Sequence, residues 1–516
     1  MNLPRKKLPI GIQNFAEIVD GGYYYVDKTE YAYRLADQGK YYFLSRPRRF
    51  GKSLFLDTLK ELFEGKEVLF RGLYVQDRWD WSKKYPVLRI SFGGGVLKNL
   101  RSLDEVLHQQ LDSYERGYEL PARYPDLRSR FRDLIEQLHR RSGLGVVVLV
   151  DEYDKPILDN ISDSAVALQM RDGLRDFYSV IKDSDAHIRF AFLTGVSKFG
   201  KVSLFSGLNN LTDISVSADC SAICGYTEHD ADTVFAAELD GLERAEIRRW
   251  YNGYNWLGEA VYNPFDLLLL FKNREFKPYW FETGTPTFLI DLLTERHTWL
   301  PALGRLEADA EMLSTFDIGN IPTEALMFQA GYLTIAQRER ISGEYYFRLR
   351  FPNREVEQSL YGNLLRAWTH EAQAAVKNKK ALFRLLSSND LGGLKALFHA
   401  FYAAIPHDWY RNNPLAQYEG YWASVFYSYF AALGLTPQAE EATNHGCIDM
   451  TVRLNGRIYL FEFKVVELTP EGCALQQIKD RGYADKYRAE GATIHLIGVE
   501  FSKETRNIVG FEVETL

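Results

Sequence analysis

The sequence predicts a mixed α/β protein built from several domains. At 516 residues the chain is too long for one hydrophobic core, because single cores stop growing at about 250–300 residues. Between residues 23 and 223 short apolar runs alternate with helical stretches, which is typical of a three-layer unit with a largely parallel sheet. Near the C-terminus two strand-like runs flank Asn455-Gly456, a strong hairpin signal. We therefore expect three domains, at residues 1–225, 226–406 and 407–516.

The composition is that of an ordinary cytoplasmic protein. Hydrophobic residues make up 46% and charged residues 25%, and no apolar run approaches the roughly 20 residues that cross a bilayer. The basic N-terminus has no apolar core behind it, so we expect no secretory signal and no membrane. Four scattered cysteines favour buried thiols over disulfides or a zinc site. The net charge of −7 leaves nucleic-acid binding open, because a local cleft can be basic.

Four strands and two helices are predicted in the first domain. The helices cover residues 54–63 and 127–141, and the strands cover residues 41–44, 86–92, 145–150 and 188–193. The third strand is almost purely aliphatic, so we expect it to be buried on both faces of a parallel sheet.

The segment 45–53 joins the first strand to the first of these helices and resembles a phosphate-binding loop. Gly51 lets the backbone approach an anion, Lys52 offers a positive charge to the outer phosphates, and the Ser53 hydroxyl can hold Mg²⁺. Arg46 stands where the first glycine of the common motif would fall. We expect Arg46 and Arg49 to contact the nucleotide where other loops use backbone. The predicted cofactors are ATP and Mg²⁺ or Mn²⁺.

An acidic pair follows the aliphatic strand, at the sheet edge where open α/β sheets bind ligands. Asp151 is predicted to hold Mg²⁺, and Glu152 to orient or deprotonate the attacking water. Thr194, at the end of the next strand, is the candidate sensor of the γ-phosphate. A helix cap or solvated strand end explains an isolated acidic pair equally well, but the loop on the first strand favours the catalytic interpretation.

The middle region is predicted to be mostly helical. We interpret its aromatic clusters at 250–256 and 262–265 as packing at helix junctions. A helix at 326–335 and a short hairpin around 345–352 are compatible with a winged-helix-like lid. Arg348 and Arg350 alternate with aromatic residues and fit either a nucleic-acid contact or a half-buried strand.

The C-terminal hairpin predicts a metal site. If Leu454 faces Arg457 across the turn, Asp449 faces Glu462, with Cβ atoms about 5 Å apart. Opposed carboxylates repel unless a cation lies between them, and Lys464 on the same face is a partial answer. Mg²⁺ or Mn²⁺ on the two carboxylates would make a phosphodiesterase site.

The alternative is an exposed charge cluster on an ordinary hairpin. Two flanking helices favour the metal site, because they offer Glu419 and Gln477 as supporting residues.

Taken together, these segments resemble an AAA-ATPase-like family that carries a C-terminal PD-(D/E)XK nuclease-superfamily domain. The resemblance covers nearly the whole chain and rests on residues 25–29, 46–53, 151–156, 194–198, 250–254, 462–464 and 477–478. It implies a P-loop domain followed by a restriction-endonuclease-like domain, with Arg46 as a family trait.

The resemblance also implies site residues. Phosphate binding falls to Lys52 and Ser53, and the handling of Mg²⁺ and water to the acidic pair 151–152. The nuclease core consists of Asp449, Glu462 and Lys464. One departure is the segment 440–448, which lacks the arginine that the family commonly has before the metal aspartate; this puts contacts to the scissile phosphate in doubt.

Two functions remain open at this point. The first is a nuclease, with DNA favoured over RNA, whose metal site is controlled by the nucleotide state of the N-terminal domain. The second is an ATP-dependent switch or scaffold whose nuclease-like domain binds without cutting. An oligomer and a role in defence or mobile elements are compatible with both, the latter only by association with the domain pairing.

Overall fold

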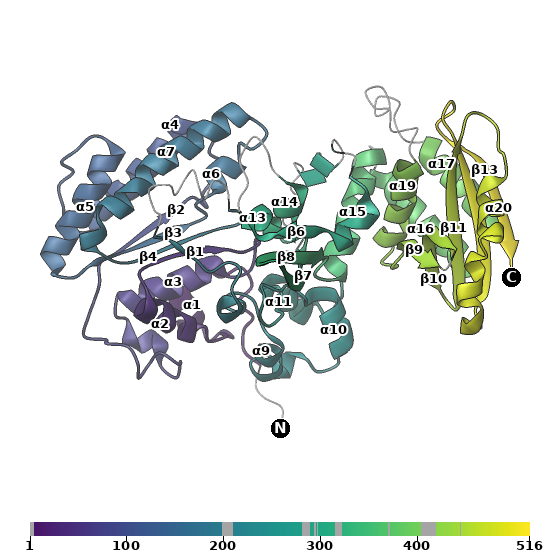
Figure 1. Cartoon of the computed structure of the whole chain (residues 1–516). Helices are drawn as coiled ribbons and strands as arrows, with labels where there is room; N and C mark the ends of the chain where they lie inside the picture. Colours follow the sequence, from purple (N-terminus) through teal and green to yellow (C-terminus); the bar gives the residue numbers. More distant parts are fainter. Residues whose placement is uncertain are drawn as a thin grey trace. The chain divides into compact units, whose positions relative to one another are not determined.

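The computed structural model describes residues 5–198, 210–280, 289–290, 292–293, 296, 298–314, 322–369, 372–403, 419–443 and 445–516. The chain divides into two compact units, which Figure 1 shows coloured along the sequence. The first unit consists of Met1–Thr283 and Leu306–Asn353, and the second of Gly284–Arg305 and Arg354–Leu516. The predicted middle region, 226–406, therefore contributes to both units.

A parallel five-stranded sheet forms the centre of the first unit. Its order is β2-β3-β4-β1-β5, and the strands are β1 (Tyr41–Ser45), β2 (Val87–Ser91), β3 (Val146–Asp151), β4 (Ile188–Gly195) and β5 (Thr212–Asp213). All residues of β1 and β3 are buried, as their apolar sequences predict. Ser45 is level with Gly195, and Val150 with Leu193. The segments that follow β1, β3 and β4 therefore leave the sheet side by side.

Helices cover both faces of this sheet, so the predicted three-layer α/β fold is confirmed (Figure 1). One layer contains α4 (Leu100–Gly117), α5 (Leu127–Ser142) and α7 (Ser164–Asp183). The other contains α1 (Phe15–Asp20), α2 (Thr29–Gln38) and α3 (Lys52–Phe63), and the short α6 (Lys155–Leu158) follows β3. Of the helices that the structure describes, none is long and apolar enough to cross a membrane.

Side chains of α4 form hydrogen bonds with backbone groups on the edge of strand β2 that faces away from β3. Gln110 accepts from the backbone N–H of Ser91 at 2.8 Å and donates to its carbonyl at 3.0 Å. The hydroxyl of Tyr114 accepts from the N–H of Arg89 at 2.7 Å and donates to its carbonyl at 2.8 Å. Since an open edge would pair with other chains, these contacts protect the sheet and fix the backbone at Arg89.

A second core in the same unit is built largely from aromatic residues. It is formed by α9 (Glu228–Thr233), α10 (Arg244–Tyr251) and α11 (Pro264–Asn273). Tyr251, Tyr254 and Tyr262 are fully buried, and Trp256 is nearly so. The interpretation of the two aromatic clusters as packing is therefore confirmed.

A small antiparallel sheet completes the first unit. Its order is β6-β8-β7, from β6 (Glu307–Asp309), β7 (Thr334–Ile341) and β8 (Glu344–Arg350), and α13 (Ala310–Ser314) and α14 (Thr323–Ala330) lie between β6 and β7 in sequence. The expected helix at 326–335 is wrong in its second half. Gly331 ends α14 with φ +91°, where a Cβ atom would lie 2.6 Å from Pro47, and the chain then enters β7.

The second unit contains the other five-stranded sheet, ordered β13-β12-β11-β10-β9. Its strands are β9 (Gln438–Thr443), β10 (Gly446–Leu454), β11 (Arg457–Val466), β12 (Thr493–Ser502) and β13 (Ile508–Thr515). Only the β11–β12 pair is parallel. Asn455 and Gly456 have φ of 50° and 73°, as the predicted two-residue turn requires, and Leu454 faces Arg457.

The second unit contains the helices α15 (Arg354–Thr369), α16 (Ala372–Ser388), α17 (Leu391–Ala403), α19 (Glu419–Ala432) and α20 (Cys473–Asp480). Of these, α19 and α20 pack on this sheet with different side chains. Phe426 of α19 packs on Phe461 and Phe463, whereas Ile478 of α20 belongs to a core with Ile458 and Leu460. Because side chains alternate along a strand, Glu462 and Lys464 point to the face that α20 covers.

Candidate functional sites

The predicted phosphate loop leaves β1 and enters α3. Gly51 adopts φ +90°, with no atom within 4 Å of where a Cβ would lie, and Lys52 is the first helical residue. The Lys52 ammonium donates to the carbonyls of Arg46 and Pro47, both at 2.9 Å. Burial lowers the pKa of Lys52, and the negative charge of Asp151 opposes that effect. The Lys52 ammonium is therefore bound by two carbonyls of its own loop.

Arg46 takes a structural place in this loop. Its side chain is 0% exposed and donates to the carbonyls of Ser45, Ser215 and Cys220 at 2.6–3.0 Å. The guanidinium also lies 3.9 Å from the ring centroid of Trp256. The expectation that Arg46 contacts the nucleotide needs correction, because its guanidinium is enclosed and bound to main-chain carbonyls.

Arg49 and Phe50 connect the loop to the aromatic clusters at 250–256 and 262–265. Arg49 is exposed, has φ +70°, and places its guanidinium 4.8 Å from the ring centroid of Phe265. Phe50 is buried edge-on against Tyr254 and Trp256, at 4.7 and 5.5 Å between ring centroids. Tyr254 and Trp256 therefore pack against the loop through Phe50, and Arg49 places an exposed positive charge beside the loop.

The acidic pair lies at the carboxyl edge of the sheet, as predicted. Asp151 is the last residue of β3, and its Oδ1 is buried and accepts no hydrogen bond within the described part of the chain. Glu152 has φ +55°, a conformation that is uncommon outside glycine and often marks a functional site. Its carboxylate faces Gly93. Burial and then the charge of Asp151 raise the pKa of Glu152, which makes its carboxylate a stronger base.

Thr194 differs from its predicted role. It is 0% exposed, and its hydroxyl donates to the carbonyl of Leu44 at 2.9 Å, so it holds β4 to β1. The nearby carboxylate of Asp154, which sequence reasoning missed, accepts from the N–H groups of Val196 and Ser197 and thereby fixes the segment after β4.

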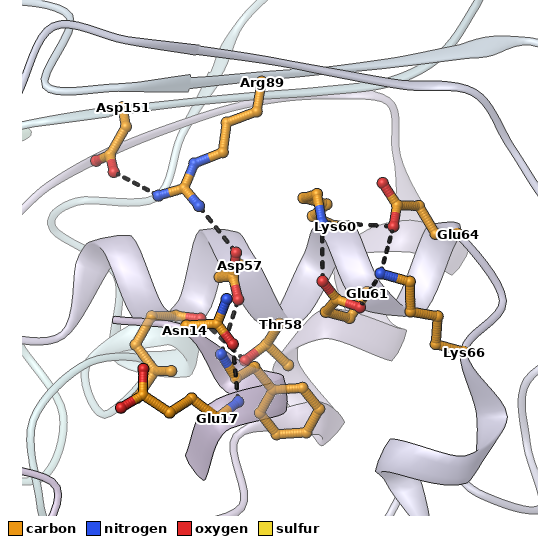
Figure 2. Close-up of polar contacts among 12 residues, drawn as sticks. Asn14, Glu17, Asp57, Thr58, Lys60, Glu61, Glu64, Lys66, Arg89 and Asp151 are labelled. Carbon is orange, nitrogen blue, oxygen red and sulfur yellow. Dashed lines mark hydrogen bonds and ion pairs between the residues drawn. The ribbon is translucent and has the colours of Figure 1, made fainter. Parts of the chain in front are cut away.

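Sequence reasoning also missed Arg89, which Figure 2 shows between two carboxylates. It lies 3.1 Å from Asp151 Oδ2 and 2.9 Å from Asp57 Oδ1. The available signal was the single charged residue in an otherwise apolar strand with one hydroxyl, Val-Leu-Arg-Ile-Ser.

The second candidate site lies on the C-terminal hairpin. The register Met450 to Phe461 brings Asp449 next in line opposite Glu462. Regular pairing stops at Met450, and Asp449 Oδ2 instead accepts from the N–H of Phe463 at 2.7 Å. The register up to Met450 is the one from which the juxtaposition of the two carboxylates was predicted.

Glu462 is the most enclosed member of this site. It is 1% exposed; its Oε1 accepts from the side-chain amide of Gln477 and lies 3.8 Å from the Lys464 ammonium. The structure thus brings Glu462, Lys464 and Gln477 together. Glu419 begins α19, but its side chain lies outside the described residues. In the described ranges no three His, Cys, Asp or Glu side chains gather as a ready metal cluster.

Arg481 approaches the segment that lacks the expected arginine. It follows α20 and is exposed, and its guanidinium donates to the carbonyl of His445 at 3.1 Å. Burial and the charges of Glu462 and Asp449 raise the pKa of Tyr483, and the charge of Arg481 opposes this effect. The tertiary structure therefore places a cation from a later segment beside the turn between β9 and β10.

The position of α20 depends on Glu500 of β12, which sequence reasoning also missed. The buried Glu500 carboxylate accepts from the backbone N–H groups of Glu471, Cys473 and Ala474 at 2.7, 2.7 and 3.3 Å. Gly498 allows the close approach, because a Cβ there would lie 2.3 Å from the Leu475 nitrogen. Glu500 thus anchors the helix that presents Gln477.

Replacing Glu500 by alanine is expected to loosen the start of α20. Loss of a charged acceptor shared by three N–H groups should cost about 2 kcal/mol, so amide exchange at residues 471–474 should be roughly 30-fold faster in hydrogen-exchange mass spectrometry. Glu514→Ala is the control, because Glu514 of β13 forms an exposed pair with Lys479 of α20. Equal exchange in the two variants would contradict the anchoring role.

The parallel sheet with its phosphate loop and the mixed sheet with its opposed carboxylates define an ATPase-like protein with a nuclease-like C-terminal domain. Comparisons with known families agree. A family described as "Predicted AAA-ATPase" matches residues 9–205, and the PD-(D/E)XK nuclease superfamily matches residues 417–511. The chain therefore belongs to the family that joins these two domains.

One curated relative extends over the whole chain. It is 64% identical over 515 residues, covering 100% of both chains, and is described as "Uncharacterized protein in vnfD 5'region" of Azotobacter chroococcum mcd 1. No solved structure matches this chain. The comparisons thus define the domain pairing.

Proposed function

We propose that the first unit binds and hydrolyses ATP and that its nucleotide state controls cleavage of nucleic acid by the second unit. The observation that carries the proposal is the site on the C-terminal hairpin, where the register opposes Asp449 and Glu462 and Lys464 lies beside them. The same chain carries a phosphate loop and an acidic pair at one sheet edge, which supplies a nucleotide-dependent control.

In the nucleotide site, Lys52 would turn from the loop carbonyls to the outer phosphates, where its charge is better neutralised. Ser53 and Asp151 would hold Mg²⁺, and the buried Asp151 Oδ1, which accepts no hydrogen bond within the described ranges, fits that role. A bound Mg²⁺ neutralises charge on the transferred phosphoryl group. Glu152 would orient and deprotonate water, and the exposed Arg49 would contact phosphate. We assign Arg46 to support of the loop.

In the nuclease site, Asp449 and Glu462 are the hard oxygen donors that Mg²⁺ or Mn²⁺ prefers. A bound cation there polarises the phosphodiester and makes water more acidic. Lys464 would stabilise the negative charge that develops on the phosphate, and the Gln477 amide keeps the Glu462 carboxylate oriented. Arg481 is the candidate that contacts substrate phosphate in place of the missing arginine.

The proposal extends to substrate and setting. We propose DNA as the substrate ahead of RNA, and a cytoplasmic location, which the two exposed free cysteines, Cys447 and Cys473, support because exposed thiols persist in reducing compartments. Association of several copies would allow a neighbouring subunit to supply an arginine to the nucleotide.

Incubation of the full chain with labelled single- and double-stranded DNA and RNA tests the proposal. With Mn²⁺ or Mg²⁺ we expect cleavage of DNA that changes when ATP is added, and no cleavage in EDTA. Gel analysis of the products measures both effects. Binding of ATP without cleavage of any polymer would contradict the nuclease and leave the switch or scaffold as the function.

A further inference from the structure

Arg89 lies at a point where its side-chain direction is fixed. It is the central residue of edge strand β2, and Tyr114 bonds both its N–H and its carbonyl. The pairing of Ser91 with Asp151 places Arg89 two residues earlier on the same face, diagonally across from Asp151. Its guanidinium is therefore held over the end of β3 by the strand register and by α4.

The guanidinium joins two buried carboxylates. Exposed side-chain fractions are 22% for Arg89, 4% for Asp151 and 5% for Asp57, and the two contacts measure 3.1 and 2.9 Å. Two buried carboxylates in one region repel each other without a cation between them. The planar fork of arginine can donate to both at once, which the single ammonium of lysine does less well. Arg89 thus fixes the Oδ2 atom of Asp151 and leaves Oδ1 for another ligand.

The contact continues to the N-terminal helix, as Figure 2 shows. Asp57 lies on α3, the helix that begins with Lys52 of the phosphate loop. Its Oδ2 accepts from the backbone N–H of Phe15, the first residue of α1, at 2.7 Å. One continuous series of contacts therefore runs from Asp151 through Arg89 and Asp57 to the backbone of α1.

We propose that Arg89 is a positioning residue that holds Asp151 for Mg²⁺ and transmits occupancy of that site through Asp57 to α1. The inference rests on the proposed nucleotide site. A divalent cation bound at Asp151 would offset the negative charge of that carboxylate and weaken its attraction for Arg89. Arg89 would then be attracted more strongly to Asp57, whose other oxygen accepts from the Phe15 N–H. The first turn of α1 then responds to the metal-bound state of the nucleotide site.

Replacing Arg89 by methionine tests the proposal, because methionine keeps the apolar stem and removes the charge. Binding of a fluorescent ATP analogue to the full chain is titrated with Mg²⁺. We expect binding without Mg²⁺ to stay within about twofold of wild type, because Lys52 is unchanged. The Mg²⁺ concentration at half-saturation should rise about tenfold, as is usual when a residue that orients a metal ligand is lost.

Rescue by a conservative variant distinguishes positioning from a general structural role. Methionine and lysine both remove the guanidinium fork, but only lysine keeps a positive charge between Asp57 and Asp151. Arg89→Lys should therefore recover part of the Mg²⁺ affinity that Arg89→Met loses. Its partial rescue also keeps the test decisive if the methionine variant folds poorly.

Hydrogen exchange of residues 14–20 measures the transmission. Adding Mg²⁺ and nucleotide should change exchange at Phe15 in the wild type and leave it unchanged in Asp57→Asn. If wild type fails to bind nucleotide, the proposed function and this inference both fail. If wild type binds and Arg89→Met has the same Mg²⁺ dependence, the inference alone is overturned.

Discussion

Glu462→Gln should abolish metal-dependent cleavage of nucleic acid and leave ATP binding unchanged. Glutamine keeps the size of the side chain and can still bond Gln477, so the buried environment of Glu462 is preserved. It removes the negative charge that holds the cation opposite Asp449. Because metal catalysis is worth several kcal/mol, the cleavage rate should fall on the order of a thousandfold or more. Initial rates on labelled DNA with Mn²⁺ measure the effect.

Two further variants make this result specific. Glu514→Gln changes a half-buried glutamate of the same sheet that pairs with the exposed Lys479, and it should cleave like the wild type. Lys464→Ala should also lose cleavage, because Lys464 lies 3.8 Å from the Glu462 carboxylate and supplies the positive charge of the site. Cleavage that persists in Glu462→Gln would show that the hairpin is not the reaction centre.

Lys52→Ala should abolish ATP hydrolysis. The ammonium is buried within the loop and contacts only carbonyls there, at 2.9 Å each, so it is ready to exchange these acceptors for phosphate oxygens. A charge-assisted hydrogen bond is worth about 1.5–3 kcal/mol, and its loss should weaken nucleotide binding about 10- to 100-fold. Fluorescence titration measures the binding loss, and phosphate release measures hydrolysis.

Lys60→Ala is the matched control, because Lys60 lies two turns further along the same helix and pairs with Glu61 and Glu64, both of which Lys66 also contacts. It should bind and hydrolyse ATP like the wild type. In Lys52→Ala any cleavage should also become insensitive to ATP, since the proposed control starts at this loop. Hydrolysis at the wild-type rate in Lys52→Ala would rule out the loop as the nucleotide site.

Local rules in the sequence were sufficient for the elements that carry both sites. Gly51 permits the left-handed turn before α3, and the aliphatic run before Asp151 can only be a buried strand. Asn455-Gly456 fixes a two-residue turn, and the turn sets the register that pairs Met450 with Phe461. These predictions succeeded because turn type and strand period depend on neighbours in sequence.

The same local reasoning failed where a contact crosses the chain. The helix expected at 326–335 ends early because Gly331 must approach Pro47, far away in sequence. Thr194 was expected at the nucleotide but bonds Leu44 of the neighbouring strand. Nothing in the local pattern distinguishes a hydroxyl that faces a ligand from one that faces another strand.

The sequence by itself determined an α/β protein with a phosphate loop on its first strand, an acidic strand end and a carboxylate hairpin. Only the tertiary structure decided which polar side chains hold those sites in place. Arg46 is enclosed by three carbonyls, Arg89 lies between Asp57 and Asp151, and Glu500 anchors α20. The physical reason is that a buried charge must find partners, and those partners come from strands and helices that only folding brings together. The phosphate loop and the hairpin are thus local features, and their support is a property of the whole fold.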